Sequence, residues 1–169
     1  VTLGEDAKFT EDSKETALTW ISGNTATEIK NIPDGTYTLH EVAAPNGYEV
    51  ATDIEFTIKD GKVVIDGEEV ANKTVVMTDN TAIVKIKKQD IGGNELAGAT
   101  LTLTGKDDKG AISFNTENVT LGEDAKFTEN SSKTALEWIS GKTATEIKNI
   151  PDGTYTLHEV AAPNGYEVA

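Results

Sequence analysis

The chain of 169 residues contains no cysteine, which excludes disulfides, thiol catalysis and cysteine-ligated zinc together. No stretch approaches the ~20 apolar residues of a membrane-spanning helix, and no window shows helical periodicity with caps. Positive charge is scarce, because 29 Asp and Glu face 15 Lys and Arg, for a formal charge of −14. Such a surface repels nucleic-acid phosphates. It suits the exterior of an extracellular protein about as well as that of an acidic cytosolic one.

What the sequence has instead is a long internal repeat. Residues 119–169 restate residues 1–51 with an offset of 118 residues, and only five positions differ. All five differences involve polar or charged residues, so we expect them on solvated faces or loops. A period of this size is typical of a whole domain rather than of a solenoid turn. The chain therefore contains about 1.4 copies of a tandem domain.

Most readable segments alternate apolar and polar residues with a period of two, as half-buried β-strands do. Turn sequences such as Pro-Asp-Gly, Asn-Gly and Asp-Gly separate them and favour hairpins. The pattern predicts an all-β fold, an antiparallel Ig-like or transthyretin-like β-sandwich of about seven short strands per period. The expected strands are 37–41, 54–58, 63–65, 74–78, 83–88, 99–104, 136–139, 145–150 and 155–159.

The repeat frame places the natural domain boundary near Asn80 and Thr81. We predict that residues 1–80 are the C-terminal part of one repeat, without its first strands. Residues 81–169 are then the N-terminal part of the next repeat, without its closing strands. On this division neither part is a complete sandwich.

Four charged side chains fall where strand alternation places apolar residues: Lys88, Asp79, Glu159 and its first-copy equivalent Glu41. An isolated charge in a core costs several kcal/mol, so these groups must pair or neutralise. Burial shifts a lysine toward the free amine and a carboxyl toward the protonated acid. An amine beside a protonated acid, with a second carboxyl to move protons, indicates nucleophilic acyl substitution. The product is an isopeptide crosslink, formed with loss of water.

Several runs carry a specific resemblance. One run is VKIKKQDIGGNELAGATLTL, which contains Lys-x-Asp and Leu-Ala-Gly-Ala-Thr. It is similar to the opening strands of the Cna B-type domains of Gram-positive surface proteins, which are also called SpaA or prealbumin-like domains. YTLHEVAAPNGYEVATDIEFTI and VVMTDN resemble the later strands of those domains. Within the family, the chain looks most like the fibronectin-binding-protein domain behind SpyTag and SpyCatcher. The resemblance covers essentially the full period.

The resemblance implies a role for each charged residue. Lys88 corresponds to the nucleophile, Asp79 to the electrophile with Asn80 as the alternative, and Glu159 or Glu41 to the proton shuttle. The chain departs from the family pattern because these residues belong to different repeats. In the family the first and last strands are parallel neighbours, and a parallel pair needs a crossover of a dozen or more residues. Asp79 and Lys88 are nine positions apart, so we expect the bond to form between chains or with other parts of a longer parent.

The resemblance also implies a function: a stalk or fibre module of a bacterial cell-surface adhesin or pilus-like protein. The bond formation is autocatalytic, and we expect no conventional enzyme activity, no cofactor and no metal. The expected partners are other copies of the domain, by tandem contact or head-to-tail strand complementation, and host matrix reached through other domains. The expected location is the bacterial cell surface, anchored by regions outside this chain. A host-matrix or carbohydrate-binding module is the alternative.

Overall fold

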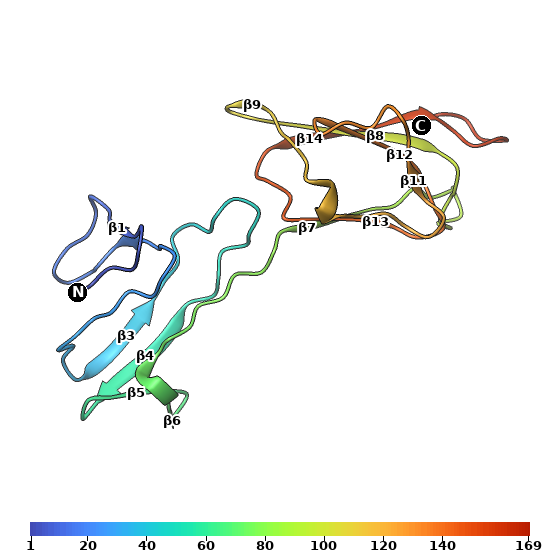
Figure 1. Ribbon diagram of the computed structural model, residues 1–169. Coiled ribbons are helices and arrows are strands. Elements are labelled where there is room, and N and C mark those ends of the chain that lie inside the picture. Colours follow the sequence, from blue (N-terminus) through green and yellow to red (C-terminus); the bar gives the residue numbers. More distant parts are fainter. The chain divides into compact units, whose positions relative to one another are not determined.

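The computed structural model describes all 169 residues, and they form two compact units. The first unit contains residues 1–39 and 53–76, and the second contains residues 40–52 and 77–169. Between its loops and turns the chain forms β-strands (Figure 1), with two three-residue 3-10 helices at Ala71–Lys73 and Thr116–Asn118. Neither helix could cross a membrane.

The second unit is a sandwich of two antiparallel sheets, seen as two layers in Figure 1. One sheet has the order β10-β13-β7, formed by Val119–Thr120, Thr145–Lys148 and Ile83–Ile86. The other has the order β11-β12-β8-β14, formed by Lys126–Phe127, Ala135–Ile139, Thr100–Asp107 and Thr154–Ala161, with β9 (Gly110–Ala111) paired to β8.

The core of this unit lies between the two sheets. Side chains from β8 and β12 alternate inward, and the other sheet supplies Ile147. Aromatic rings give this core much of its apolar area. Its fully buried members are Ala99, Leu101, Leu103, Phe114, Leu136, Trp138 and Ile147.

The first unit consists of two smaller antiparallel sheets. β1 (Lys8–Phe9) pairs with β2 (Trp20–Ile21). A four-stranded meander follows, with the order β3 (Gly35–Leu39), β4 (Ile54–Lys59), β5 (Lys62–Ile65) and β6 (Glu68–Glu69). Its buried side chains are few, namely Ile58 and Val63.

The two sequence copies fold to different extents although their sequences are nearly identical. β12 runs for five residues, whereas its first-copy equivalent β2 runs for two. Leu136 is fully buried, whereas Leu18 is 36% exposed. The difference follows from β8, which pairs with β12 over five residues and has no counterpart beside β2.

The all-β sandwich fold is therefore confirmed, and most expected strands form within one or two residues. The strand expected at 74–78 is wrong: this segment forms no ladder. Val75, Met77 and Asp79 are still half-buried and alternate with exposed residues. This alternating burial is typical of an extended segment, but no neighbouring strand pairs with its backbone. The domain boundary at 80/81 stays a prediction.

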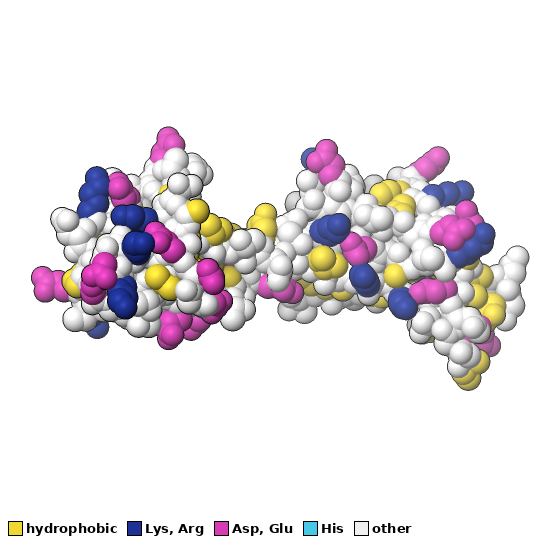
Figure 2. All heavy atoms as spheres, turned by 90° about the horizontal axis from the view of Figure 1, so that it is seen from below, with side chains coloured by type: hydrophobic (Ala, Val, Ile, Leu, Met, Phe, Trp, Pro, Cys, Tyr) yellow, Lys and Arg dark blue, Asp and Glu magenta, His cyan; other side chains and the backbone are white.

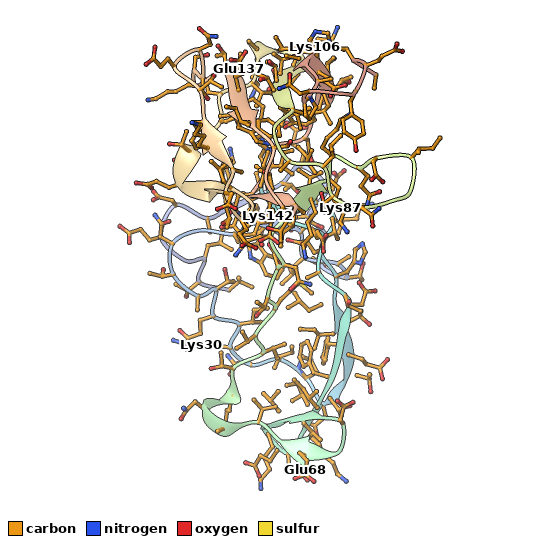
Figure 3. The ribbon with its side chains drawn as sticks, turned by 90° about the vertical axis from the view of Figure 1, so that its right-hand side faces the viewer. Lys30, Glu68, Lys87, Lys106, Glu137 and Lys142 are labelled. Atoms are coloured by element: carbon orange, nitrogen blue, oxygen red, sulfur yellow. The ribbon has the colours of Figure 1, made fainter.

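The five positions that differ between the copies lie mostly on the exterior, as expected. Four of the five pairs are exposed in both copies, whereas Thr19 and Glu137 are half-buried. Glu137, labelled in Figure 3, accepts hydrogen bonds from Thr128 at 2.6 Å and Asn130 at 3.1 Å. Figure 2 shows Asp and Glu side chains spread over the face that it draws, interspersed with lysines.

The difference in burial generates a stability prediction. Leu136→Ala leaves a cavity in a packed core and is expected to lower the free energy of unfolding of the second unit by about 2–5 kcal/mol. The matched change Leu18→Ala removes a partly exposed side chain and should cost well below that. Urea unfolding followed by tryptophan fluorescence measures both, because Trp20 and Trp138 report on the two copies. Equal losses for the two variants would contradict the packing described.

Candidate functional site

Lys88 lies two residues beyond β7 and keeps the alternation of that strand. Its side chain is 16% exposed, whereas the neighbouring Lys87, labelled in Figure 3, is 57% exposed. The Lys88 carbonyl accepts a hydrogen bond from the Leu96 N–H at 2.7 Å. A short hairpin therefore holds the backbone of Lys88 and directs its side chain inward, as alternation predicted.

A buried serine supports this hairpin. Ser140 Oγ donates to the Leu96 carbonyl at 2.7 Å and accepts from the Ala99 N–H at 2.9 Å. Ser140 follows β12 directly, so it ties the segment after Lys88 to the core sheet. Sequence reasoning missed this residue, because a lone serine after a strand carries no recognisable signal.

Glu159 lies near the end of β14, opposite Leu101 of β8. A register irregularity between Glu159 and Ala161 follows it immediately, and such bulges redirect side chains. The Glu159 side chain is only 5% exposed, and its Oε2 accepts the Ala169 N–H at 2.7 Å. The Glu159 carboxylate is thus fixed by the backbone ten residues later.

The first copy repeats this arrangement. Glu41 Oε2 accepts the Ala51 N–H at 2.6 Å, again across ten residues. The Ala-Ala-Pro-Asn-Gly-Tyr loop therefore folds back in both copies so that its end binds the glutamate at its start. Sequence reasoning did not foresee this backbone clamp. The signal that the sequence offers is the same ten-residue spacing in each copy.

Lys88 and Glu159 form the central contact of the site. Lys88 Nζ lies 3.0 Å from Glu159 Oε1. This oxygen is buried, and the Lys88 ammonium is the group that faces it. The lysine therefore supplies the compensation that a buried carboxylate needs.

The pKa of Glu159 lies below its usual range. The Ala169 N–H makes the largest contribution, desolvation opposes it, and the Lys88 ammonium lowers the pKa further. The carboxylate form of Glu159 is therefore favoured in this arrangement. A backbone donor and a lysine within 3.0 Å outweigh the burial that would neutralise the acid.

Asp79 lies apart from that pair, next to Glu41. It is half-buried, and its pKa is raised by desolvation first and by the charge and hydrogen bonding of Glu41 second. The direction expected for an acid in an apolar setting is confirmed for this residue. Asn80, the alternative electrophile, is exposed, and its carbonyl accepts the Glu49 N–H at 2.8 Å.

The structure thus brings the predicted site residues together in two pairs, Lys88 with Glu159 and Asp79 with Glu41. No hydrogen bond or ion pair joins Lys88 to Asp79. The roles of these residues as nucleophile, electrophile and proton shuttle stay predictions. The geometry gives one amine in contact with a carboxylate and one carboxyl, that of Asp79, whose pKa is raised.

An apolar hollow lies on the same unit. β14 pairs with β8 along one edge only, and Leu157 is 48% exposed. In the first unit the equivalent strand β3 pairs with β4, and Tyr37 stacks on Phe56 with ring centroids 5.6 Å apart. The hollow is lined by Val84, Ile86, Leu103, Ile150, Tyr155 and Leu157.

The comparisons with known proteins agree with the fold. The family model of the SpaA prealbumin-like fold domain matches residues 4–71 and 82–169, and the chain belongs to this family. Domains of this family occur in surface proteins of Gram-positive bacteria. No curated protein and no solved structure matches the chain. No group of three or more His, Asp or Glu side chains is arranged to hold a metal ion.

The Asp79–Glu41 pair generates a titration prediction. Replacing Glu41 with Gln removes the negative charge beside Asp79, so the pKa of Asp79 should fall toward its ordinary value of 3.8 while remaining raised by desolvation. Carboxyl-carbon NMR titration measures this pKa directly. Glu159→Gln is the matched control and should leave the titration of Asp79 unchanged. An unshifted Asp79 in the Glu41 variant would contradict the pairing.

The Lys88–Glu159 pair generates a pH prediction. The folded pKa of Glu159 is lowered, so its contribution to stability is present above the unfolded value of about 4.5 and is lost as pH falls through the folded pKa. Glu159→Gln should therefore destabilise the second unit at neutral pH. The loss should lie between the ~1 kcal/mol of an exposed pair and the ~3–5 kcal/mol of a fully buried one.

Urea unfolding of both proteins between pH 7 and pH 3 checks this dependence. The difference between them should stay constant down to about pH 4.5, the unfolded value, and shrink below it. Glu41→Gln, which has no lysine partner, should not show the same neutral-pH loss. A gap that grows on acidification would contradict the lowered pKa of Glu159.

Proposed function

We propose that this chain is part of the stalk or fibre of a bacterial surface protein and that its repeats are closed by autocatalytic lysine–aspartate isopeptide bonds. The observation that carries the proposal is the buried contact of Lys88 Nζ with Glu159 Oε1 at 3.0 Å. An amine held against a carboxylate supports the assignment of Lys88 as nucleophile and Glu159 as base.

The reaction follows from these two groups. Additional burial by a closing strand removes water from the pair and favours its neutral form, in which Glu159 holds the proton of Lys88. The free amine then attacks the carboxyl carbon of an aspartate, so that a C–N bond forms and a C–O bond breaks. Glu159 gives that proton to the departing hydroxyl, which leaves as water, and its carboxylate then takes the remaining extra proton from the nitrogen as the amide forms. No oxidant, metal or cofactor enters this balance.

The aspartate for Lys88 comes from a segment equivalent to 74–80. Asp79 itself belongs to the repeat that precedes Lys88, and it already lies beside Glu41. We therefore assign the electrophile of Lys88 to the closing strand of the same repeat or of another copy of the chain. The raised pKa of Asp79 supports its assignment as electrophile, because the protonated acid has the better leaving group.

The crosslink would give the module its mechanical function. It joins the first and last strands of a repeat, so a pulled domain cannot extend beyond the bond. By analogy with a disulfide that closes a loop of about 100 residues, the loss of unfolded-state entropy is worth about 4–5 kcal/mol. The chain contains no cysteine, so no disulfide can supply this stabilisation. Near-identical tandem copies suit a spacer, in which each repeat performs the same task.

We also propose where the parent protein is anchored and which type of surface protein it is. Cell-wall anchoring and an adhesive tip would be supplied by other parts of the parent protein. The sequence resemblance to the fibronectin-binding-protein type supports the Lys–Asp chemistry over Lys–Asn chemistry. The function proposed for the chain is to hold a tip away from the cell rather than to bind host matrix itself.

The test is covalent capture of a closing strand. A synthetic peptide of residues 72–80 is incubated with the full chain, and the products are examined by denaturing gel and intact mass spectrometry. We expect an adduct lighter by one water than the sum of the two components. Loss of ammonia instead would move the electrophile to Asn80.

Three variants control this experiment. Lys88→Ala should abolish the adduct, and Glu159→Gln should slow its formation by orders of magnitude. A peptide with Asp79→Ala should not react. The chain alone at high concentration should give a ladder with one water lost at each junction. If neither the peptide nor a second chain reacts while the fold is intact, the crosslinking proposal is wrong.

A further inference from the structure

The tip of the loop between Glu41 and Ala51 makes contacts that play no part in the proposed crosslinking reaction. This tip, Pro45–Tyr48, comes from the first sequence copy but belongs to the second compact unit. The Tyr48 N–H closes its turn by donating to the Pro45 carbonyl at 3.0 Å. Gly47 is buried, which is unusual for the tip of a polar turn.

One side of the tip pairs with the chain segment that opens the second repeat. The Gly47 carbonyl accepts the Ala82 N–H at 2.9 Å, and the Glu49 N–H donates to the Asn80 carbonyl at 2.8 Å. Tyr48 and Thr81 form an antiparallel bridge between these two bonds. Residues 47–49 therefore act as a short strand added to residues 80–82.

The other side contacts the Asn-Ile-Pro-Asp turn of the second copy. Asn46 Oδ1 accepts the Asp152 N–H at 2.8 Å, and Asn149 Nδ2 donates to the Gly47 carbonyl at 3.4 Å. The Ile150 N–H donates to the Ala82 carbonyl at 3.4 Å. The opening segment is thus held between a turn of one copy and a turn of the next.

The fit at Gly47 requires a glycine for two reasons. Its φ is +89°, a conformation that other residues adopt at a cost. A Cβ at this position would also lie 3.0 Å from the Asn149 carbonyl oxygen. Gly165, its equivalent in the second copy, has almost the same φ of +90° but nothing within 4 Å of a Cβ. The positive φ is therefore a property of the turn itself. The close approach to the Asn149 carbonyl oxygen occurs only at Gly47, where the tip meets the turn of the second copy.

We propose that the Pro-Asn-Gly-Tyr tip is a docking element that joins each repeat to the one after it. Its receptor is the opening segment together with the Asn-Ile-Pro-Asp turn of the following repeat. The tip and the receptor turn are both duplicated in the sequence, because Asn164 and Gly165 repeat the tip and Asn31 and Asp34 repeat the receptor turn. A tip on one end and a receptor on the other form a head-to-tail contact that can propagate along an array.

This inference is independent of the crosslink. It rests on backbone hydrogen bonds and a buried glycine, and neither Lys88 nor Asp79 takes part. A chain with Lys88→Ala should keep the docked tip, whereas a chain with an altered tip should still react with a closing-strand peptide. Failure of one proposal can therefore be distinguished from failure of the other.

The test compares Gly47→Ala with Gly165→Ala in the full chain. Both variants carry the same backbone strain, but only the first forces a Cβ against the receptor turn. We expect amide hydrogen exchange of Ala82 and Asp152 to speed up at least about tenfold more in Gly47→Ala than in Gly165→Ala. Exchange in β8 and β12 should stay as in the parent chain, which shows that the sandwich is intact.

A second pair, Asn46→Ala and Asn164→Ala, removes one acceptor without backbone strain. Asn46→Ala should release the Asp152 amide, and Asn164→Ala should leave it protected. Equal exchange in the members of either pair would overturn the proposal. It would likewise be overturned if the Ala82 amide of the parent chain exchanged as fast as an unprotected amide.

Discussion

The pairing of β8 with β12 and β14 is the interaction on which the second unit depends. β8 supplies Leu101 and Leu103 to the core and forms ladders on both of its edges. Where this strand is present, an almost identical sequence forms a five-residue strand with a fully buried leucine; where it is absent, the strand shrinks to two residues. Strand stability comes from cross-strand neighbours and burial more than from intrinsic preference. The same ladder sets Glu159 opposite Leu101, so the core strand also positions the candidate site.

Two identical loops show how neighbours decide the electrostatics of a carboxylate. The backbone clamp on Glu41 and that on Glu159 are the same within 0.1 Å. Glu159 then meets a lysine, and its pKa is lowered, whereas Glu41 meets Asp79 and raises the pKa of that acid. The local sequence therefore provides a fixed carboxylate, and the adjacent strand determines what it does. The proton-shuttle role proposed for these glutamates needs this property, because a shuttle must stabilise an ammonium first and an acid later.

Alternation along the chain predicted which way Lys88, Asp79 and Glu159 point, and turn residues located most hairpins. Both signals are local, and local sequence is enough to decide the face on which a side chain lies. Neither signal says whether a partner strand is present. Residues 74–78 therefore read as a strand but form no ladder, and Leu157 reads as a core residue but is 48% exposed. The Ala169 N–H that holds the Glu159 carboxylate was not foreseen either, because a loop conformation brings it there.

The loop from Glu41 to Ala51 combines two constraints within ten residues. At its base the Ala51 N–H fixes the carboxylate, and at its tip Gly47 is enclosed by the following repeat. The loop of the second copy has the clamp at its base but an open tip at Gly165. A loop held at both ends loses little further entropy when its carboxylate engages a lysine, whereas a loop held at one end must still be ordered. In an array, docking of each tip would therefore restrain the glutamate at the base of the same loop, as the contacts of Gly47 and Glu41 do in one loop here.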